Sequence, residues 1–409
     1  MKILVIIPYI FLPPVSGNQN LLSNLLKYVA NEIYCDLILL VNSDTDITAS
    51  KAAIRRVYPN IGNIIIFTKP RGISLLLAMF QAFANGYHPA LGRYHNKLLI
   101  NWLSENVVKG AYDLIHFDMF HTAPYRKFCK DIPTLLVSSD AYSMAAQNAG
   151  TLSRKIKTRL RSPIETALLK NFEKNEYSKF NMVCTVSEVD AKYLQSVASP
   201  IEIKTIGIAL DPAFSERKIT HLNTKPEKKI LCTGNLDHAI ISDGMIEFLK
   251  RDLVSIRKFH PDVKVTILGK NPTVELKRCI EITDRVKHVD FVDHYDDFLD
   301  QDWVYVYPQK CATGLQTKLQ QALSLALPVV GYKVSFGGLM IKSGTHCYVC
   351  NNSDDLVRHV LSLISDVRLR REIGLNAATH IRENFSINKV GMQMVEIYKD
   401  IIKHYKSVE

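Results

Sequence analysis

Short apolar runs alternate with stretches of helical periodicity along most of this chain. Ile3–Ile7 has no polar position, as expected of a strand buried on both faces of a parallel sheet. A stretch of helical spacing follows this run, with Leu21, Leu22, Leu25, Leu26 and Val29. Repeated strand–helix alternation predicts an α/β fold with parallel sheets covered by helices on both faces.

The alternation loosens around residues 212–229, where prolines and polar side chains gather. A length of 409 residues fits two domains of ordinary size. We therefore predict two doubly wound, Rossmann-like domains facing across a cleft: residues 1–206, a linker at 207–228, and residues 229–385. Residues 386–409 are expected to form a helix that packs back towards the first domain. Long helices are also predicted at about 74–106 and 314–326, and a strand is predicted at 289–292.

Several functional classes lack their sequence signatures. The chain has no GxxxxGK[ST] loop, no GxGxxG after a strand, no HExxH and no GxSxG. The apolar stretch at 73–83 is shorter than the ~20 residues that a membrane-spanning helix needs. We interpret residues 3–12 as a first strand rather than an export signal, and expect a cytoplasmic protein with reduced thiols. Cys347 and Cys350 form a lone CxxC, which favours strand cysteines over a redox or zinc motif.

The most informative segment is Tyr307–Val330, in which a strand, a short loop and a helix starting near Gly314 follow one another. Free amides at such a helix start, together with Lys318, would form an anion site. Gln321 lies three residues after Lys318, on the same helix face. A capped helix with a solvated lysine remains the alternative from spacing alone.

The same segment resembles the donor site of retaining nucleotide-sugar glycosyltransferases with the GT-B fold, family 4 (group 1). The resemblance rests on Gly314-Leu315-Gln316-Thr317-Lys318 and on Pro328-Val-Val330. It extends, in the expected order along residues 1–385, through Leu4–Pro8 with Gly17, Asp113–His116 with His121, Val186–Asp190, Ile206–Asp211, Thr233–Asn235 and Ile267–Pro272.

The resemblance implies transfer of a sugar from a nucleoside diphosphate to a hydroxyl of a lipid-linked or surface-glycan acceptor. It further implies retention of configuration, with no cofactor and no metal. His121 and Lys318 would be catalytic. The implied donor-binding residues are Gly17, Gly234, Asn235, Lys270, Gly314, Leu315, Gln316, Thr317 and Gln321. The implied acceptor-binding residues are His116, Asp118 and Asp140.

Some positions depart from the family pattern. Gln321 replaces the ribose-binding glutamate, and Thr313 replaces its upstream partner. Asn235 and Asp243 stand near the places of an Arg and a Lys that bind the diphosphate in many members. A sugar-nucleotide epimerase with the GT-B fold and a degenerate, glycan- or lipid-binding partner subunit therefore remain alternatives.

The net charge of +11 is concentrated in residues 1–206, which hold 23 Lys and Arg against 15 Asp and Glu. A basic cluster consists of Arg154, Lys155, Lys157, Arg159 and Arg161. Because Ile156 and Leu160 are interleaved with it, we expect docking on an anionic membrane surface. A solvated helix face is the alternative. No nucleic-acid-binding motif accompanies the charge, so no nucleic-acid partner is expected.

Overall fold

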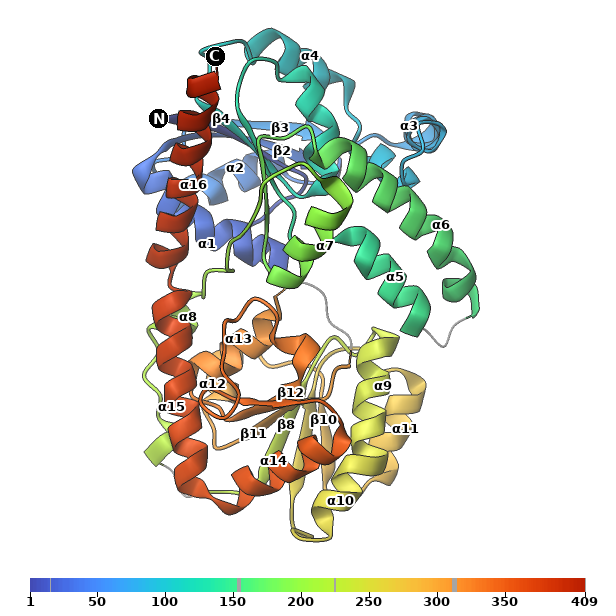
Figure 1. Cartoon of the computed structure of the whole chain (residues 1–409), viewed down its shortest axis with the longest axis vertical. Helices are drawn as coiled ribbons and strands as arrows, with labels where there is room; N and C mark the ends of the chain where they lie inside the picture. The colour runs from blue at the N-terminus through green and yellow to red at the C-terminus, as the bar shows by residue number, and fades with distance from the viewer. Residues whose placement is uncertain (15, 153–155, 224–225, 311–314, 409) are drawn as a thin grey trace. The chain divides into compact units, whose positions relative to one another are not determined.

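The computed structural model describes residues 1–14, 16–152, 156–223, 226–310 and 315–408 (Figure 1). These residues form two units. The first comprises Met1–Ala209 together with Ile387–Glu409, and the second comprises Leu210–Ser386. Both units are α/β, with a buried parallel sheet between helices, as the alternating sequence predicts.

The first unit is built on a seven-stranded sheet of order β3-β2-β1-β4-β5-β6-β7. Its strands are β1 (Lys2–Ile7), β2 (Tyr34–Val41), β3 (Ile64–Thr68), β4 (Leu114–Asp118), β5 (Thr134–Val137), β6 (Met182–Thr185) and β7 (Ile203–Thr205). In the central register, Val5 of β1 pairs with Leu37 on one side and His116 on the other. The strand order therefore reverses between β1 and β4, which is where ligands bind in open sheets of this kind.

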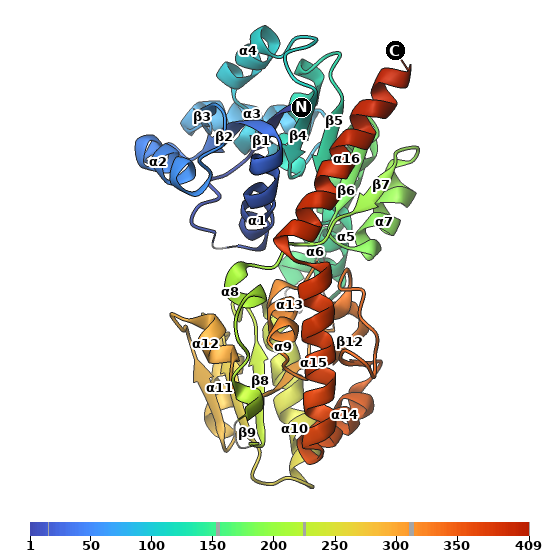
Figure 2. The same ribbon diagram turned by 90° about the vertical axis from the view of Figure 1, so that its left-hand side faces the viewer.

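Helices cover both faces of this sheet. They are α1 (Gly17–Glu32), α2 (Ile47–Val57), α3 (Gly72–Ala84), η1 (Pro89–Tyr94), α4 (Lys97–Asn106), η2 (Phe120–Phe128), α5 (Tyr142–Leu152), α6 (Ile156–Phe172), η3 (Glu173–Tyr177), α7 (Glu188–Ala198) and α16 (Ile387–Val408). The C-terminal helix α16 packs against α1 and beside β5 (Figure 2). Gly391 allows this approach, because a Cβ there would lie 2.3 Å from the ring of Tyr28.

The second unit has a six-stranded sheet of order β10-β9-β8-β11-β12-β13. Its strands are β8 (Lys229–Thr233), β9 (Lys264–Leu268), β10 (Val286–Val289), β11 (Val304–Tyr307), β12 (Val329–Tyr332) and β13 (Tyr348–Cys350). Its helices are α8 (Pro212–Ser215), η4 (His221–Asn223), α9 (Ala239–Glu247), η5 (Phe248–Asp252), α10 (Leu253–Arg257), α11 (Val274–Ile282), α12 (Tyr295–Leu299), α13 (Thr317–Ser324), η6 (Lys333–Phe336), α14 (Ser353–Ser365) and α15 (Val367–Asn384). Here the strand order reverses between β8 and β11.

The stretch expected to be a linker at 207–228 is largely part of the second unit. Asp211 caps α8 by accepting from the amide of Ala213. Arg217 is 2.5 Å from Asp296, and the Thr220 amide donates to Asp300. These bonds attach the stretch that begins at Leu210 to the region of α12. The chain therefore passes from the first unit to the second near Ala209.

The helix predicted at about 74–106 is divided into α3, η1 and α4. Gly86 adopts a φ of +74°, which ends the first helix, and Pro89 starts the next turn. In the part of the chain that the structure describes, no helix is long and apolar enough to cross a membrane.

Candidate functional site

Three predicted donor residues follow neighbouring strands of the second sheet. Gly234 and Asn235 come directly after β8, and Lys270 comes two residues after β9. The α13 helix follows β11, the neighbour of β8 on its other side. Because carboxyl ends of parallel strands share one edge of the sheet, these residues gather at the point where the strand order reverses.

The loops after β8 and β9 touch through two glycines. The Gly234 amide donates to the carbonyl of Leu268 at 3.1 Å. A Cβ on Gly269 would lie 2.1 Å from the Gly234 carbonyl oxygen, and one on Gly234 would lie 2.6 Å from Ile241. Backbone atoms therefore form the floor of this edge, and neither position has room for a side chain.

The α13 helix begins at Thr317 with Gln316 as its N-cap residue, and the Gln316 side chain does not cap the helix. Instead, Gln316 Oε1 accepts a hydrogen bond of 2.8 Å from the Tyr307 hydroxyl at the end of β11. This bond holds the helix start against the sheet, and among the residues that the structure describes no side chain caps the first turn. Leu315 is buried beneath them. Such a helix start attracts anions.

Lys318 lies in the first turn of α13 and is partly buried. Burial lowers the pKa of its ammonium group. Within the described residues no carboxylate pairs with it, which leaves its charge for an anionic ligand. Gln321, also partly buried, follows one turn later.

Gln309 is a further polar residue at this edge, and the sequence analysis did not identify it. Its side chain is 1% exposed, and neither Nε2 nor Oε1 has a hydrogen-bond partner among the described residues. A buried amide without partners costs stability. The close approach of Gly244 to the Pro308 carbonyl brings α9 against this position, since a Cβ on Gly244 would lie 2.6 Å from that oxygen. A polar residue directly after a buried strand is the signal that could have indicated it.

Lys270 places its ammonium group 4.2 Å from the ring centroid of Phe291. Phe291 follows β10 and is 59% exposed, although the sequence predicted a strand at 289–292. The strand ends at Val289, and the aromatic ring beyond it offers a flat apolar surface beside a cation at the same sheet edge.

In the first unit, the reversal between β1 and β4 also gathers predicted residues. The Tyr9 hydroxyl, just after β1, donates a hydrogen bond to Asp118 Oδ2 at 2.6 Å. Asp118 is 2% exposed, and burial raises the pKa of its carboxyl group to about 7. Gly17 is the first residue of α1, whose N-cap Ser16 accepts from the amide of Gln19. The sequence analysis missed Tyr9.

His121 lies in η2, within an aromatic cluster of this unit. Its ring centroid is 3.9 Å from that of Phe120 and 4.2 Å from that of Tyr94. Burial and the nearby Lys69 lower the pKa of its imidazole to about 3, and Nδ1 has no hydrogen-bond partner. His121 contributes to the wall of a cavity of about 110 Å³ together with Tyr94, Tyr125 and residues of α3. A neutral imidazole with a free nitrogen can hydrogen-bond a hydroxyl group.

His116 and Asp140 differ from His121 in their surroundings. His116 is 1% exposed, and its Nδ1 lies 2.7 Å from the Tyr398 hydroxyl of α16. Burial lowers the pKa of its imidazole to about 3. The acceptor contact that the sequence analysis predicted for His116 would require this buried side chain to become accessible. Asp140 follows β5 and is partly buried, and its carbonyl accepts from Ser138 Oγ.

Three predicted binding residues, Gly314, Arg154 and Lys155, lie outside the described residues. Lys157, Arg159 and Arg161 lie on the exposed face of α6. Arg161 Nε is 2.6 Å from Glu165. The predicted basic cluster is therefore described over its C-terminal part.

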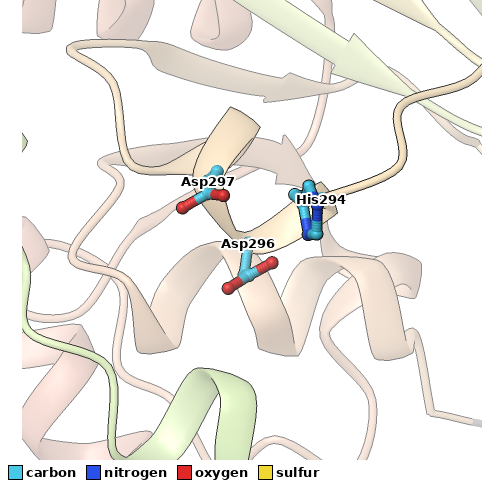
Figure 3. A group of neighbouring side chains, drawn as sticks. All are labelled: His294, Asp296 and Asp297. Atoms are coloured by element: carbon cyan, nitrogen blue, oxygen red, sulfur yellow. The ribbon is translucent and has the colours of Figure 1, made fainter.

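His294, Asp296 and Asp297 bring potential metal-ligand atoms within 4.8 Å of one another (Figure 3). Arg217 already pairs with both carboxylates, at 2.5 Å for Asp296 and in a close contact with Asp297. The guanidinium group supplies the positive charge that these acids need. Their geometry is therefore explained by an ion-pair network that fixes the segment after α8.

Two other features have structural explanations. Cys347 and Cys350 are buried free thiols, and burial raises the pKa of each to about 12, which does not suit redox chemistry. A groove of about 1200 Å³ lies beside α10, α14 and β12. Three of its basic residues have acidic partners: Lys310 and Arg251 pair with Glu247, at 2.6 and 2.9 Å, and Arg358 pairs with Asp355 at 2.6 Å.

Comparison with known proteins gives a family match over most of the second unit. Residues 227–366 match the family model described as glycosyl transferases group 1. An uncharacterized 44.6 kDa protein in the cps region of Klebsiella pneumoniae is 25% identical over 169 residues, which cover 39% of this chain and 43% of that protein. N-acetyl-alpha-D-glucosaminyl L-malate synthase of Bacillus anthracis is 26% identical over 155 residues, 36% of this chain and 40% of that enzyme. Each match thus spans about two fifths of the curated relative's length.

The crystal structure of HepE from Anabaena in complex with UDP superimposes with a TM-score of 0.64 at 15% identity, covering 98% of this chain and 100% of that chain. This likeness confirms the predicted GT-B fold of two Rossmann-like domains. Together with the family match, it confirms the resemblance to nucleotide-sugar glycosyltransferases.

Proposed function

We propose that this GT-B protein, whose second unit matches the glycosyl transferases group 1, transfers a sugar from a nucleoside diphosphate to an acceptor hydroxyl. The observation that carries the proposal is Lys318 in the uncapped first turn of α13, beside the reversal of strand order at β8 and β11. Its partly desolvated ammonium group, without a carboxylate partner among the described residues, fits a diphosphate.

The chemical demand on such a site is to stabilise the leaving diphosphate while positive charge develops on the sugar ring. Lys318 and the N-terminal end of α13 would supply fixed positive charge and dipoles where negative charge increases. One such donor typically contributes about 3 kcal/mol to transition-state stabilisation, or roughly a hundredfold in rate. Gln309 and Gln321 would hold neutral parts of the donor by hydrogen bonds, and the Gly234 and Gly269 loops would let the ligand approach the backbone.

The nucleobase would lie on the apolar surface of Phe291 beside Lys270. UDP is the first nucleotide to test, since the structurally similar HepE was solved with UDP. Gln321 in place of a glutamate would still accept one ribose hydroxyl, with a weaker, uncharged hydrogen bond.

The proposed reaction retains the anomeric configuration and needs no metal or cofactor. Asp118, the carboxylate nearest His121 in the sequence, is buried and bonded to Tyr9, so it is poorly placed to be a nucleophile. A front-face reaction would then be used, in which the leaving phosphate accepts the proton of the attacking hydroxyl. The neutral His121 would orient that hydroxyl or a neighbouring one.

The acceptor is proposed to be a lipid-linked or surface-glycan hydroxyl, with the protein at the cytoplasmic face of a membrane. The match to a protein of a cps region and the basic residues of α6 support this assignment. The relative from Bacillus anthracis is named for L-malate, so a small hydroxy acid belongs in the acceptor panel.

The test is a thermal-shift screen of the full chain against nucleoside diphosphates and their sugars, because a ligand bound only by the native state raises its Tm. Donors that stabilise the protein are then incubated with and without acceptors, and the products are analysed. Transfer to a glycan or malate supports the proposal. Epimerisation of the donor alone would indicate the epimerase, and no nucleotide binding would indicate the degenerate partner subunit.

A further inference from the structure

The outer face of α3 is apolar and exposed. Its side chains lie at helical spacing and keep large exposed fractions: Ile73 77%, Leu76 65%, Leu77 64%, Phe80 70% and Phe83 53%. The sequence of α3 contains no charged residue. A contiguous apolar face of this kind is unusual on a soluble surface and marks an interaction site.

A second helix continues this surface with both apolar and basic side chains. On α6, Ile156 is 72% exposed, Leu160 73% and Ile164 62%, each one turn after the last. Lys157, Arg159 and Arg161 lie between them.

The two helices are joined at one corner of the first unit. Asn171 Nδ2 of α6 donates to the Gly86 carbonyl just beyond α3 at 3.0 Å, and Glu165 is 3.7 Å from His88. Figure 1 shows α3 and α6 on the same side of this unit.

From this geometry we propose that the outer face of α3 inserts into the interface of an anionic lipid bilayer while α6 rests on its headgroups. With 13 residues, α3 is shorter than the ~20 needed to span a bilayer, so it would lie in the plane of the interface. The basic residues Lys157 and Arg159 of α6 supply the matching charge for anionic headgroups. Lipid is favoured over a protein partner because the large exposed side chains of α3 other than Gln81 are apolar, and every charged residue of α3 and α6 except Glu165 is positive.

Docking through α3 would also affect the proposed acceptor site, because the inner face of α3 lines the cavity beside His121. This step rests on the proposed function. Ala78, Gln81 and Ala82 line the same cavity as His121. Gly92 of η1 seats α3 there, since a Cβ on Gly92 would lie 2.4 Å from the Met79 amide. One helix therefore has its outer face towards lipid and its inner face on the proposed acceptor cavity. Docking through α3 would present that cavity to a lipid-linked acceptor.

The experiment is flotation of the full chain with vesicles of phosphatidylcholine alone or mixed with phosphatidylglycerol. We expect binding to the anionic vesicles. The combined changes Leu77→Glu and Phe80→Glu should lower the partition coefficient at least about tenfold, because two apolar anchors are lost. Lys157→Ala with Arg159→Ala should lower it about tenfold on anionic vesicles at low salt. Phe259→Glu, at a position 70% exposed on the second unit, is the matched control and should bind as the unchanged protein does.

A second measurement does not depend on loss of binding. In Phe80→Trp, the added fluorophore should shift to the blue on anionic vesicles, and a lipid-phase quencher should reach it. The proposal is overturned if vesicles leave this fluorescence unchanged, or if Leu77→Glu with Phe80→Glu binds them normally. It is equally overturned if those substitutions dissociate a dimer in solution, since a second copy would then cover the face. Failure of the proposed function would appear separately, as vesicle binding without nucleotide binding.

Discussion

The hydroxyl of Tyr9 donates a hydrogen bond to Oδ2 of Asp118 over 2.6 Å, joining the residues that follow β1 to the end of β4. Both side chains lie where the strand order of the first sheet reverses. Asp118 is almost completely buried, and its pKa is raised to about 7 because desolvation outweighs this single hydrogen bond. Folding therefore favours the protonated form of the Asp118 carboxyl group.

The first prediction is a pH dependence of stability that comes from Asp118. Its pKa rises from 3.8 to about 7 on folding, so the folded state holds the proton more tightly. The resulting stability is fully present below about pH 4 and is lost as the pH rises through about 7. Asp118→Asn should remove this contribution. The free energy of unfolding of the variant minus that of the unchanged protein should therefore increase between pH 5 and 8.

Urea unfolding of both proteins at several pH values measures this difference. His116 and His121 act in the opposite direction, since their pKa values fall to about 3 on folding and their contribution is lost as the pH falls below 6.5. The comparison must therefore be made between the two proteins at each pH. A difference that stays constant with pH would contradict the assignment to Asp118.

The second prediction concerns Lys318. Lys318→Ala should lower kcat at least tenfold and by roughly a hundredfold if one leaving-group donor is lost. Because burial lowers the pKa of this ammonium group, charged Lys318 lowers stability at neutral pH. The alanine variant should therefore unfold at the same or a higher urea concentration than the unchanged protein. Steady-state kinetics with the identified donor and acceptor, alongside urea unfolding, measure both effects.

Lys277→Ala is the control, because Lys277 is exposed on α11 of the same unit. It should change neither kcat nor stability. Near-normal turnover in Lys318→Ala would remove this lysine from the catalytic assignment, whereas a loss of activity through unfolding would appear in the urea curve.

The fold was predictable because buried parallel strands have few polar positions. Ile3–Ile7 and Val304–Tyr307 are continuous apolar runs, and both form central strands. The strand predicted at 289–292 was placed too late, since Phe291 is apolar but exposed beyond the end of β10. Local sequence cannot distinguish an apolar residue that packs in a core from one left on the surface, and the same holds for the exposed stripe of α3.

Site residues were predictable only where the neighbours that position them are close in the sequence. Lys318 lies in the first turn of its helix because strand, loop and helix are consecutive in the sequence. The burial of His116 could not be foreseen, because its partner, Tyr398, is 282 residues away in the sequence. Tyr9 and Gln309 were missed for a related reason: their burial and their hydrogen bonds depend on contacts between segments that are distant in the sequence.

The third prediction is that the His116–Tyr398 pair stabilises the first unit rather than catalysis. Tyr398→Phe removes the hydroxyl 2.7 Å from His116 Nδ1 and leaves that buried nitrogen without a partner. The expected loss is about 1–3 kcal/mol in the free energy of unfolding. Nucleotide affinity should not change, because the proposed donor site lies in the second unit. Tyr405→Phe, further along α16 and not fully buried, is the control. A large fall in kcat without a loss of stability would support the assignment of His116 to the acceptor-binding residues.

The last prediction tests the glycine contact beneath the proposed donor site. In Gly269→Ala the new methyl group would lie 2.1 Å from the Gly234 carbonyl oxygen, so the loops after β8 and β9 must separate. Overpacking of this kind costs about 1–3 kcal/mol of stability. Nucleotide binding should weaken as well, because both loops border the donor edge. Calorimetric titration with the nucleotide measures the affinity, and urea unfolding measures the stability.

Gly344→Ala separates the two effects: its φ of +80° makes alanine strained, but nothing lies within 4 Å of the added Cβ. That variant should lose stability and bind nucleotide normally. Equal affinity in both variants would show that the glycine contact does not shape the donor site.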